Sequence, residues 1–190
     1  MPKIIDDVQI FEAVLRVVGE RGFSGATTKQ IAKTAGISEV TLFRRFGSKQ
    51  ELVQKSAKFV VQQSDMINQM HYTGDIHADL TLIIETYMQT AVKFGDFVIQ
   101  MIIEFSHHPS LLESFEQPIG MVKTLVSIIH QYQEDGILRK EHPLEAAVEL
   151  LGPLLLKPLL LKVFPKENLS SINAEDHITR FLHGRYIGKD

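Results

Sequence analysis

Apolar residues recur three or four positions apart along almost the whole chain, which is the spacing of amphipathic helices. The first such run covers residues 5–20, with Gly22 as its stop. Further helices are predicted at about 28–35, 39–46, 49–69, 78–94, from a break at Gly95 to about His108, 118–134, 143–164 and 176–186, with a short segment at 110–116. No strand-like alternation or internal repeat is present in the sequence. The pattern predicts an all-α fold of about nine helices, with a small three-helix head and a helical bundle behind it.

The two short helices at residues 28–46 flank a tight turn and are the most informative part of this pattern. Gly36 occupies the turn position that needs a positive φ, which glycine adopts without steric cost. Ser38 is a good N-cap for the second helix, and Thr27 and Gln30 have the spacing of a capping box at the first. This combination predicts a helix-turn-helix, whose second helix lies in the DNA major groove. The alternative is an ordinary corner between two helices with a solvated outer face.

The residues after the second helix favour the helix-turn-helix. Gly47 ends that helix, and Ser48 and Glu51 have the spacing of a second capping box, which opens a third segment. Lys49 then lies in the first turn of a helix. Its amino group and the free backbone N–H groups are suited to hold a phosphate together.

Residues 10–52 resemble the TetR family of bacterial transcriptional regulators; they read IFEAVLRVVGERGFSGATTKQIAKTAGISEVTLFRRFGSKQEL. Apolar, glycine, cap and basic positions all agree with the family pattern. Two positions depart from it, because Phe43 stands where tyrosine is usual and Arg45 where histidine or tyrosine is usual. The resemblance implies a helix-turn-helix DNA-binding domain at residues 1–50 and a helical effector-binding and dimerisation domain at residues 51–190.

Side chains on and around the second short helix are the candidate DNA contacts: Thr28, Lys29, Glu39, Val40, Thr41, Phe43, Arg44, Arg45 and Lys49. Phosphate contacts are predicted for Thr28, Lys29 and Lys49. The two arginines, Arg44 and Arg45, are suited to guanine O6 and N7. Glu39 is predicted to accept from cytosine N4, unless it only complements the helix dipole. Val40 and Thr41 suit thymine methyl groups, and Phe43 is expected to pack against the sugar-phosphate backbone.

Charge along the chain agrees with DNA binding by one end. The net charge is −3, yet residues 1–58 hold ten Lys and Arg against six Asp and Glu. The rest of the chain holds ten basic and seventeen acidic residues, so a basic head precedes an acidic body. The absence of cysteine excludes disulfides and thiolate chemistry, and the first residues lack a signal-peptide pattern. A cytoplasmic protein is expected.

The segment Glu145–Phe164 is unusually rich in leucine. A membrane span is disfavoured, because charged residues interrupt the segment and Pro153 and Pro158 disturb its hydrogen bonds. Core burial is one reading, but leucines point almost all round the helix. The resemblance to the TetR family implies that the last two helices of each chain form the interface of a homodimer. The candidate interface residues are Leu151, Leu155, Leu159 and Phe181.

Soft and aromatic side chains in the middle of the chain are candidates for an effector pocket: Tyr87, Met88, Phe94, Phe97, Met101, Phe105, His107 and Met121. Ordinary core packing is the alternative for each of them. The resemblance implies that a small apolar molecule binds between these helices and moves the DNA-binding heads apart. The expected function is therefore a homodimeric, ligand-responsive regulator, a repressor that binds a two-fold-related operator.

Two other functions remain open. Glu104 and His107 match the Glu-x-x-His spacing of carboxylate-bridged di-metal enzymes, but the motif occurs once where such sites need it twice. An enzyme, a metal and a cofactor are therefore not expected. The second alternative is a constitutive DNA-binding regulator that responds to no ligand.

Overall fold

The computed structural model describes residues 6–64, 66–105, 107–164, 172–185 and 187, and the elements formed by these residues are helical. This confirms the predicted all-α fold. The described residues divide into two compact units. The first unit contains the chain up to Gln63 together with Val92–Pro118, and the second contains Ser64–Ala91 and the chain from Ile119 onward.

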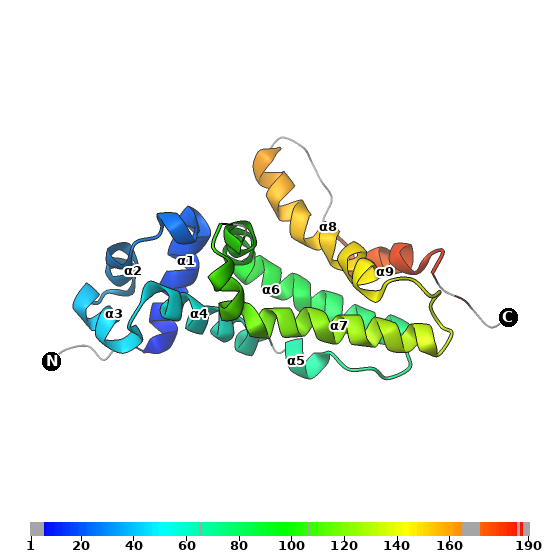
Figure 1. Ribbon diagram of the computed structural model, residues 1–190. Coiled ribbons are helices and arrows are strands. Elements are labelled where there is room, and N and C mark those ends of the chain that lie inside the picture. The colour runs from blue at the N-terminus through cyan, green and yellow to red at the C-terminus, as the bar shows by residue number, and fades with distance from the viewer. Residues whose placement is uncertain (1–5, 65, 106, 165–171, 186, 188–190) are drawn as a thin grey trace. The chain divides into compact units, whose positions relative to one another are not determined.

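The first unit begins with four helices, α1 (Asp7–Gly25), α2 (Thr28–Ala35), α3 (Glu39–Phe46) and α4 (Lys49–Ser64), which Figure 1 shows in blue to teal. Their apolar faces meet in a core of fully buried aliphatic side chains: Ile10, Val14, Ile31, Leu42 and Leu52. Burying each such side chain stabilises the fold by about 1.5–3 kcal/mol. This core holds α3 against the other helices, although α3 itself is only eight residues long.

Helix α1 ends later than the sequence predicts. Gly22 has a φ of 72°, so the regular helix is interrupted at the predicted stop, and one further turn continues to Gly25. A Cβ at Gly22 would lie 3.0 Å from Glu104 Oε1, which is a second reason for glycine at this position. The amide N–H of Ala26 then donates to Gly22 O at 3.1 Å and closes the added turn.

The break predicted at Gly95 is wrong. Helix α6 (Ile76–Phe105) is 30 residues long and continues through Gly95 without interruption. A glycine inside a helix costs only about 1 kcal/mol relative to alanine. Burial of Phe94 and Phe97 on either side of Gly95 outweighs this cost. The prediction of one helix over 49–69 also differs, since α4 ends at Ser64 and the short α5 (Met66–Gln69) follows.

The remaining elements lie close to their predicted bounds. A 3-10 segment, η1 (Pro109–Phe115), leads into α7 (Glu116–Glu134). Pro143 opens α8 (Pro143–Val163) as expected, and α9 (Ala174–Leu182) ends four residues before the predicted position. Asn173 caps α9 by accepting from the Asp176 amide N–H at 2.9 Å. The connection between the helices predicted at 143–164 and 176–186 lies largely outside the described residues.

The second unit packs the first half of α6 with α7, α8 and α9 (Figure 1). Its core includes fully buried side chains from several of these helices: Leu80, Ile84, Ile129, Tyr132 and Leu150. A polar link lies beside this core, where Asp79 accepts from the Thr73 amide N–H at 2.8 Å and from the Tyr132 hydroxyl. Among the described helices, none combines the length and the hydropathy that a bilayer crossing requires.

Candidate nucleic-acid interface

Local hydrogen bonds fix the two short helices and the turn between them. Thr27 and Gln30 form the predicted capping box, in which each side chain bonds the backbone N–H of the other residue. Gly36 has φ 72° and ψ 29°, the left-handed conformation that the turn was predicted to need. Ser38 caps α3 by accepting from the Thr41 amide N–H at 3.1 Å. The sequence therefore predicted the turn and both helix starts correctly.

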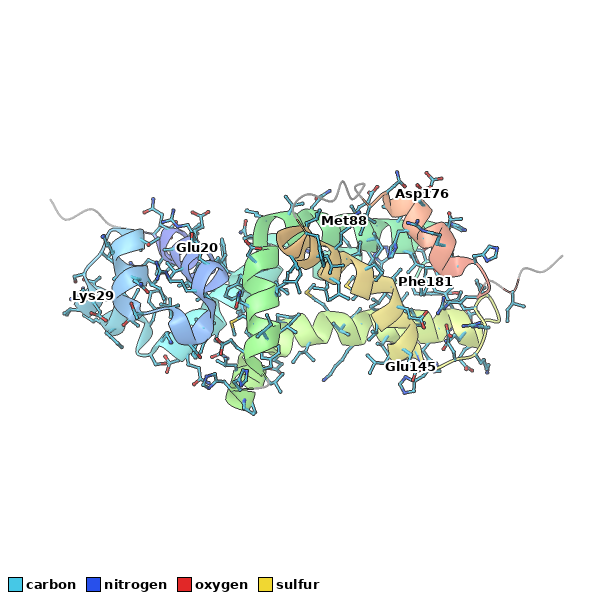
Figure 2. All side chains as sticks on the ribbon, turned by 90° about the horizontal axis from the view of Figure 1, so that it is seen from above. Glu20, Lys29, Met88, Glu145, Asp176 and Phe181 are labelled. Carbon is cyan, nitrogen blue, oxygen red and sulfur yellow. The ribbon has the colours of Figure 1, made fainter. Side chains whose placement is uncertain are left out.

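Helix α3 exposes apolar and basic side chains. Val40 is 78% exposed and Phe43 is 45% exposed, while Leu42 between them is buried in the core. Arg44 is exposed and, among the described residues, has no hydrogen-bond or ion-pair partner. Lys29 on α2 is likewise exposed at the surface of the first unit (Figure 2). These four side chains are free to meet a ligand without breaking an internal contact.

Arg45 has a different environment from Arg44. Its guanidinium pairs with Asp7 at the start of α1, and both side chains remain partly exposed. The same guanidinium lies 5.8 Å from the centre of the Phe46 ring. A contact from Arg45 to guanine stays a prediction, and it requires the pair with Asp7 to be exchanged for the base.

Lys49 makes contacts within the chain that the sequence did not predict. Its ammonium donates to Phe23 O at 2.8 Å and to Ala26 O at 3.1 Å, at the end of α1. It also lies 4.2 Å from the centre of the Phe23 ring. Burial lowers the pKa of this ammonium, against a smaller raising effect of Glu104. The predicted phosphate contact stays a prediction, and this ammonium has first to leave its two carbonyl acceptors.

Three further polar side chains of the predicted contact set are engaged near the helix starts. Thr28 donates its hydroxyl hydrogen to the Glu39 carboxylate, which joins the first residues of α2 and α3. The Thr41 hydroxyl lies 2.8 Å from Ser38 Oγ, which leaves it half-buried against the cap of its own helix. The capping pattern in the sequence indicates neither of these side-chain pairs.

Glu104 lies beside α1, where it was not expected. Its carboxylate accepts from the Ser24 amide N–H and from the Ser24 hydroxyl, both at 3.0 Å. Burial opposes the charge of this carboxylate, but the bonds from Ser24 and the nearby His108 outweigh burial and lower its pKa. His107 is exposed, and the described residues contain no group of three possible metal ligands. Glu104 thus bonds Ser24 on α1, and within the part of the chain that the structure describes no hydrogen bond or ion pair joins His107 to the same helix.

The candidate effector residues are divided between the two units. In the first unit, Phe97 and Met101 are buried, and Phe105 packs edge-on against Phe115 with ring centres 5.0 Å apart. In the second unit, three candidates pack against the core from partly buried positions: Tyr87, Met88 and Met121. Burial raises the pKa of the Tyr87 hydroxyl well above its ordinary value. An effector pocket stays a prediction.

Helix α8 exposes more apolar surface than the candidate interface residues alone. Leu151, Leu155 and Leu159 are half-buried, and Phe181, which Figure 2 marks on α9, is only 6% exposed because it packs into the core of its own unit. Six other apolar side chains of α8 are exposed: Leu144, Val148, Leu156, Leu160, Leu161 and Val163. Phe181 thus offers little surface to a partner, whereas these six, which the sequence analysis did not single out, offer much.

Comparison with known proteins agrees with this geometry. Residues 10–55 match the family model of bacterial regulatory proteins of the tetR family, a segment that begins in α1 and ends in α4. An uncharacterised helix-turn-helix transcriptional regulator of Bacillus subtilis, YvkB, is 28% identical over 145 residues, which cover 73% of this chain and 74% of that protein. A second regulator of Bacillus subtilis, PksA, is 42% identical over 67 residues, a third of each chain (33%).

The fold as a whole is also shared. A crystal structure of a tetR family regulator from Shewanella sp. PV-4 matches with a TM-score of 0.71 at 20% identity, covering 96% of this chain and 98% of that chain. The structure of a flavonoid-responsive regulator, FrrA, matches with a TM-score of 0.58 at 23% identity, covering 95% and 97%. The family is non-enzymatic. Residues 10–55 carry the helix-turn-helix of the tetR family of bacterial regulatory proteins, and this chain is a helix-turn-helix, DNA-binding transcriptional regulator.

Proposed function

We propose that this chain is a homodimeric repressor that binds a two-fold-related operator and is released from it by a small apolar effector. Residues 1–50 form the DNA-binding domain in this proposal, and residues 51–190 form the effector-binding and dimerisation domain. The observation that carries the proposal is the surface of α3, where Val40, Phe43 and Arg44 are exposed on a helix whose start is fixed by a cap.

Each head places α3 in a major groove. Arg44 bonds guanine O6 and N7, because an unpartnered guanidinium matches both acceptors at once. Val40 contacts a thymine methyl group, and Phe43 packs against the sugar-phosphate backbone. Lys29 neutralises a phosphate, which adds affinity that depends on salt concentration and carries little sequence information. Arg45 and Lys49 join these contacts by exchanging their bonds to α1 for DNA.

The exposed apolar face of α8 supports the dimer. Val148, Leu156 and Leu160 leave large apolar surfaces in water, which a second copy of the same helix would cover. A two-fold-related pair of chains presents two α3 helices to two half-sites, which lie about one helical turn or a multiple of it apart. The dimer thus explains both the surface of α8 and the need for two reading heads.

Effector control follows from linkage between the two sites. An effector that prefers the dimer with its heads apart lowers the affinity for DNA, and DNA lowers the affinity for the effector by the same factor. The soft side chains Met88 and Met121 and the ring of Tyr87 suit an apolar molecule. The name of the similar FrrA states a response to flavonoids, which are flat and aromatic, and an apolar effector for this chain agrees with that.

Selection of bound sequences from random duplex DNA tests the proposal. The expected result is a consensus of two inverted half-sites, bound by a species with twice the mass of the chain in light scattering. A bound monomer, or binding without any preferred sequence, contradicts the proposal. A thermal-shift series with apolar aromatic compounds then separates the ligand-responsive repressor from the constitutive regulator, which no compound stabilises.

A further inference from the structure

Thr28 is the first residue of α2, but it does not cap that helix. The neighbouring Thr27 does so, because its hydroxyl oxygen accepts from the Gln30 amide N–H at 3.2 Å. The Gln30 side chain completes the cap by accepting from the Thr27 amide N–H at 3.1 Å. The hydroxyl of Thr28 is thereby left for another acceptor, and it donates to Glu39 Oε1 at 2.5 Å. A hydrogen bond to a charged carboxylate is shorter and stronger than one between neutral groups.

Glu39 does not cap its helix either. Ser38 caps α3, so the carboxylate of Glu39 is not needed to satisfy the free N–H groups at the helix start. Among the described residues, Glu39 has no hydrogen-bond or ion-pair partner other than Thr28. One carboxylate oxygen is therefore held by Thr28, and the other is open to a donor outside the chain.

The position of Glu39 decides which donor that is. It is the first residue of the recognition helix, whose N-terminal residues meet base edges, and its neighbour Val40 is 78% exposed. A carboxylate accepts hydrogen bonds and repels phosphates, so it is suited to the exocyclic amine of cytosine. A glutamate that is already held loses less rotational freedom on binding than a free one.

We infer that Thr28 is a positioning residue, which holds the Glu39 carboxylate so that each head reads one cytosine through N4. The inference rests on the proposed function and deepens it, because it assigns one base of the half-site to a pair of residues. It replaces the phosphate contact that the sequence predicts for Thr28. The dipole of α3 stabilises the Glu39 charge in either case, so the dipole does not distinguish the two roles.

The test uses the full-length chain and the consensus duplex that the unaltered chain selects from random DNA. Affinities are measured at one salt concentration for this duplex and for versions with each other base pair at every position. Glu39→Gln is expected to move the preference at one position per half-site from cytosine toward adenine, because an amide pairs with adenine N6 and N7. Thr28→Val is expected to reduce discrimination at that same position by about threefold to tenfold.

Three further variants make the assignment specific. Thr28→Ser keeps a hydroxyl and is expected to keep the discrimination. Thr28→Val is expected to change nothing further in a Glu39→Ala background, since no side-chain oxygen is left there for the hydroxyl to hold. Thr34→Val removes a hydroxyl from the same helix, where it has no partner among the described residues, and is expected to change nothing. Thermal melts confirm that each variant is folded, with Thr28→Ala as a replacement should Thr28→Val not fold.

The inference is overturned when Thr28→Val weakens binding to every duplex evenly, and does so equally in the Glu39→Ala background. That result assigns Thr28 to a phosphate. It is also overturned when Thr28→Val and Glu39→Gln alter different positions of the site. Failure of the proposed function is seen separately and earlier, because the unaltered chain then selects no consensus at all.

Discussion

Helices α3 and α8 both expose apolar side chains, but their surroundings differ. On α3, the exposed Val40 and Phe43 lie beside Arg44, on a helix of eight residues that caps and a turn hold in place. On α8, exposed leucines and valines recur along 21 residues. A surface that mixes apolar and basic groups suits the polar, wet interface of DNA, whereas a long apolar face suits a second protein surface. The charges around an exposed apolar residue therefore indicate its partner better than its exposure alone.

The largest expected effect is the loss of the proposed dimer when the apolar face of α8 is changed. Replacing Leu156 and Leu160 together by glutamate is expected to raise the dissociation constant of the dimer about a thousandfold, from about 2 kcal/mol for each buried anchor. Sedimentation equilibrium over a concentration series measures this change. Val92→Glu is the matched control, because Val92 is 91% exposed on α6 and has little packing to lose. An unchanged dissociation constant removes α8 from the interface.

The next effect concerns two exposed cations of the head, Arg44 and Lys29. Arg44→Ala is expected to cost about 1–3 kcal/mol and to relax the base preference at one position of each half-site. Lys29→Ala is expected to weaken binding to all sequences evenly and to lower the salt slope by about one per head. Titrations against consensus and altered duplexes at several salt concentrations separate the two. Even weakening by Arg44→Ala makes this arginine another phosphate contact.

The next prediction compares a glycine in the turn before α3 with a glycine inside a helix. Gly36→Ala is expected to reduce the free energy of unfolding by about 1–2 kcal/mol, because φ at this position is 72°. Gly95→Ala is its control in a helix, where a Cβ meets nothing within 4 Å, and is expected to stabilise by about 0.5–1 kcal/mol. Urea unfolding measures both variants. If both variants change the free energy of unfolding by the same amount and in the same direction, the left-handed turn at Gly36 does not matter for stability.

The smallest effect tests the bond between α1 and α6. Ser24→Ala is expected to reduce the free energy of unfolding by about 1 kcal/mol at pH 7, since Glu104 loses a hydrogen bond. The pKa of Glu104 is lowered in the folded chain, so its contribution is complete above the ordinary carboxylate range and falls as the pH drops through the folded pKa. The difference between Ser24→Ala and the unaltered chain should therefore shrink in acid. A difference that is constant with pH means that the bond does not depend on the charge.

The sequence predicted those parts of the fold that rest on contacts between near neighbours. The capping box at Thr27, the left-handed Gly36 and the cap at Ser38 each involve residues at most a few positions apart, and the structure has all three. The break predicted at Gly95 was wrong, because burial of the flanking phenylalanines depends on distant parts of the chain. A local glycine signal does not contain that information.

The same distinction applies to the candidate site. The exposure of Val40 and Arg44 follows from helix periodicity and was foreseen. The partners of Lys49 and Glu104 lie 23 to 80 positions away, so no pattern in the sequence indicated them. The burial of Phe181 was missed for the same reason, since it depends on how α9 packs in its unit.

Methylation protection of a bound consensus duplex tests most directly whether α3 reads bases in the major groove. Dimethyl sulfate modifies guanine N7 in the major groove and adenine N3 in the minor groove, so one reaction reports on both sides of the duplex. The account predicts two clusters of protected guanine N7, related by two-fold symmetry and about one helical turn or a multiple of it apart, and loss of one guanine from each cluster in Arg44→Ala. Saturated binding that leaves every guanine N7 reactive contradicts the account.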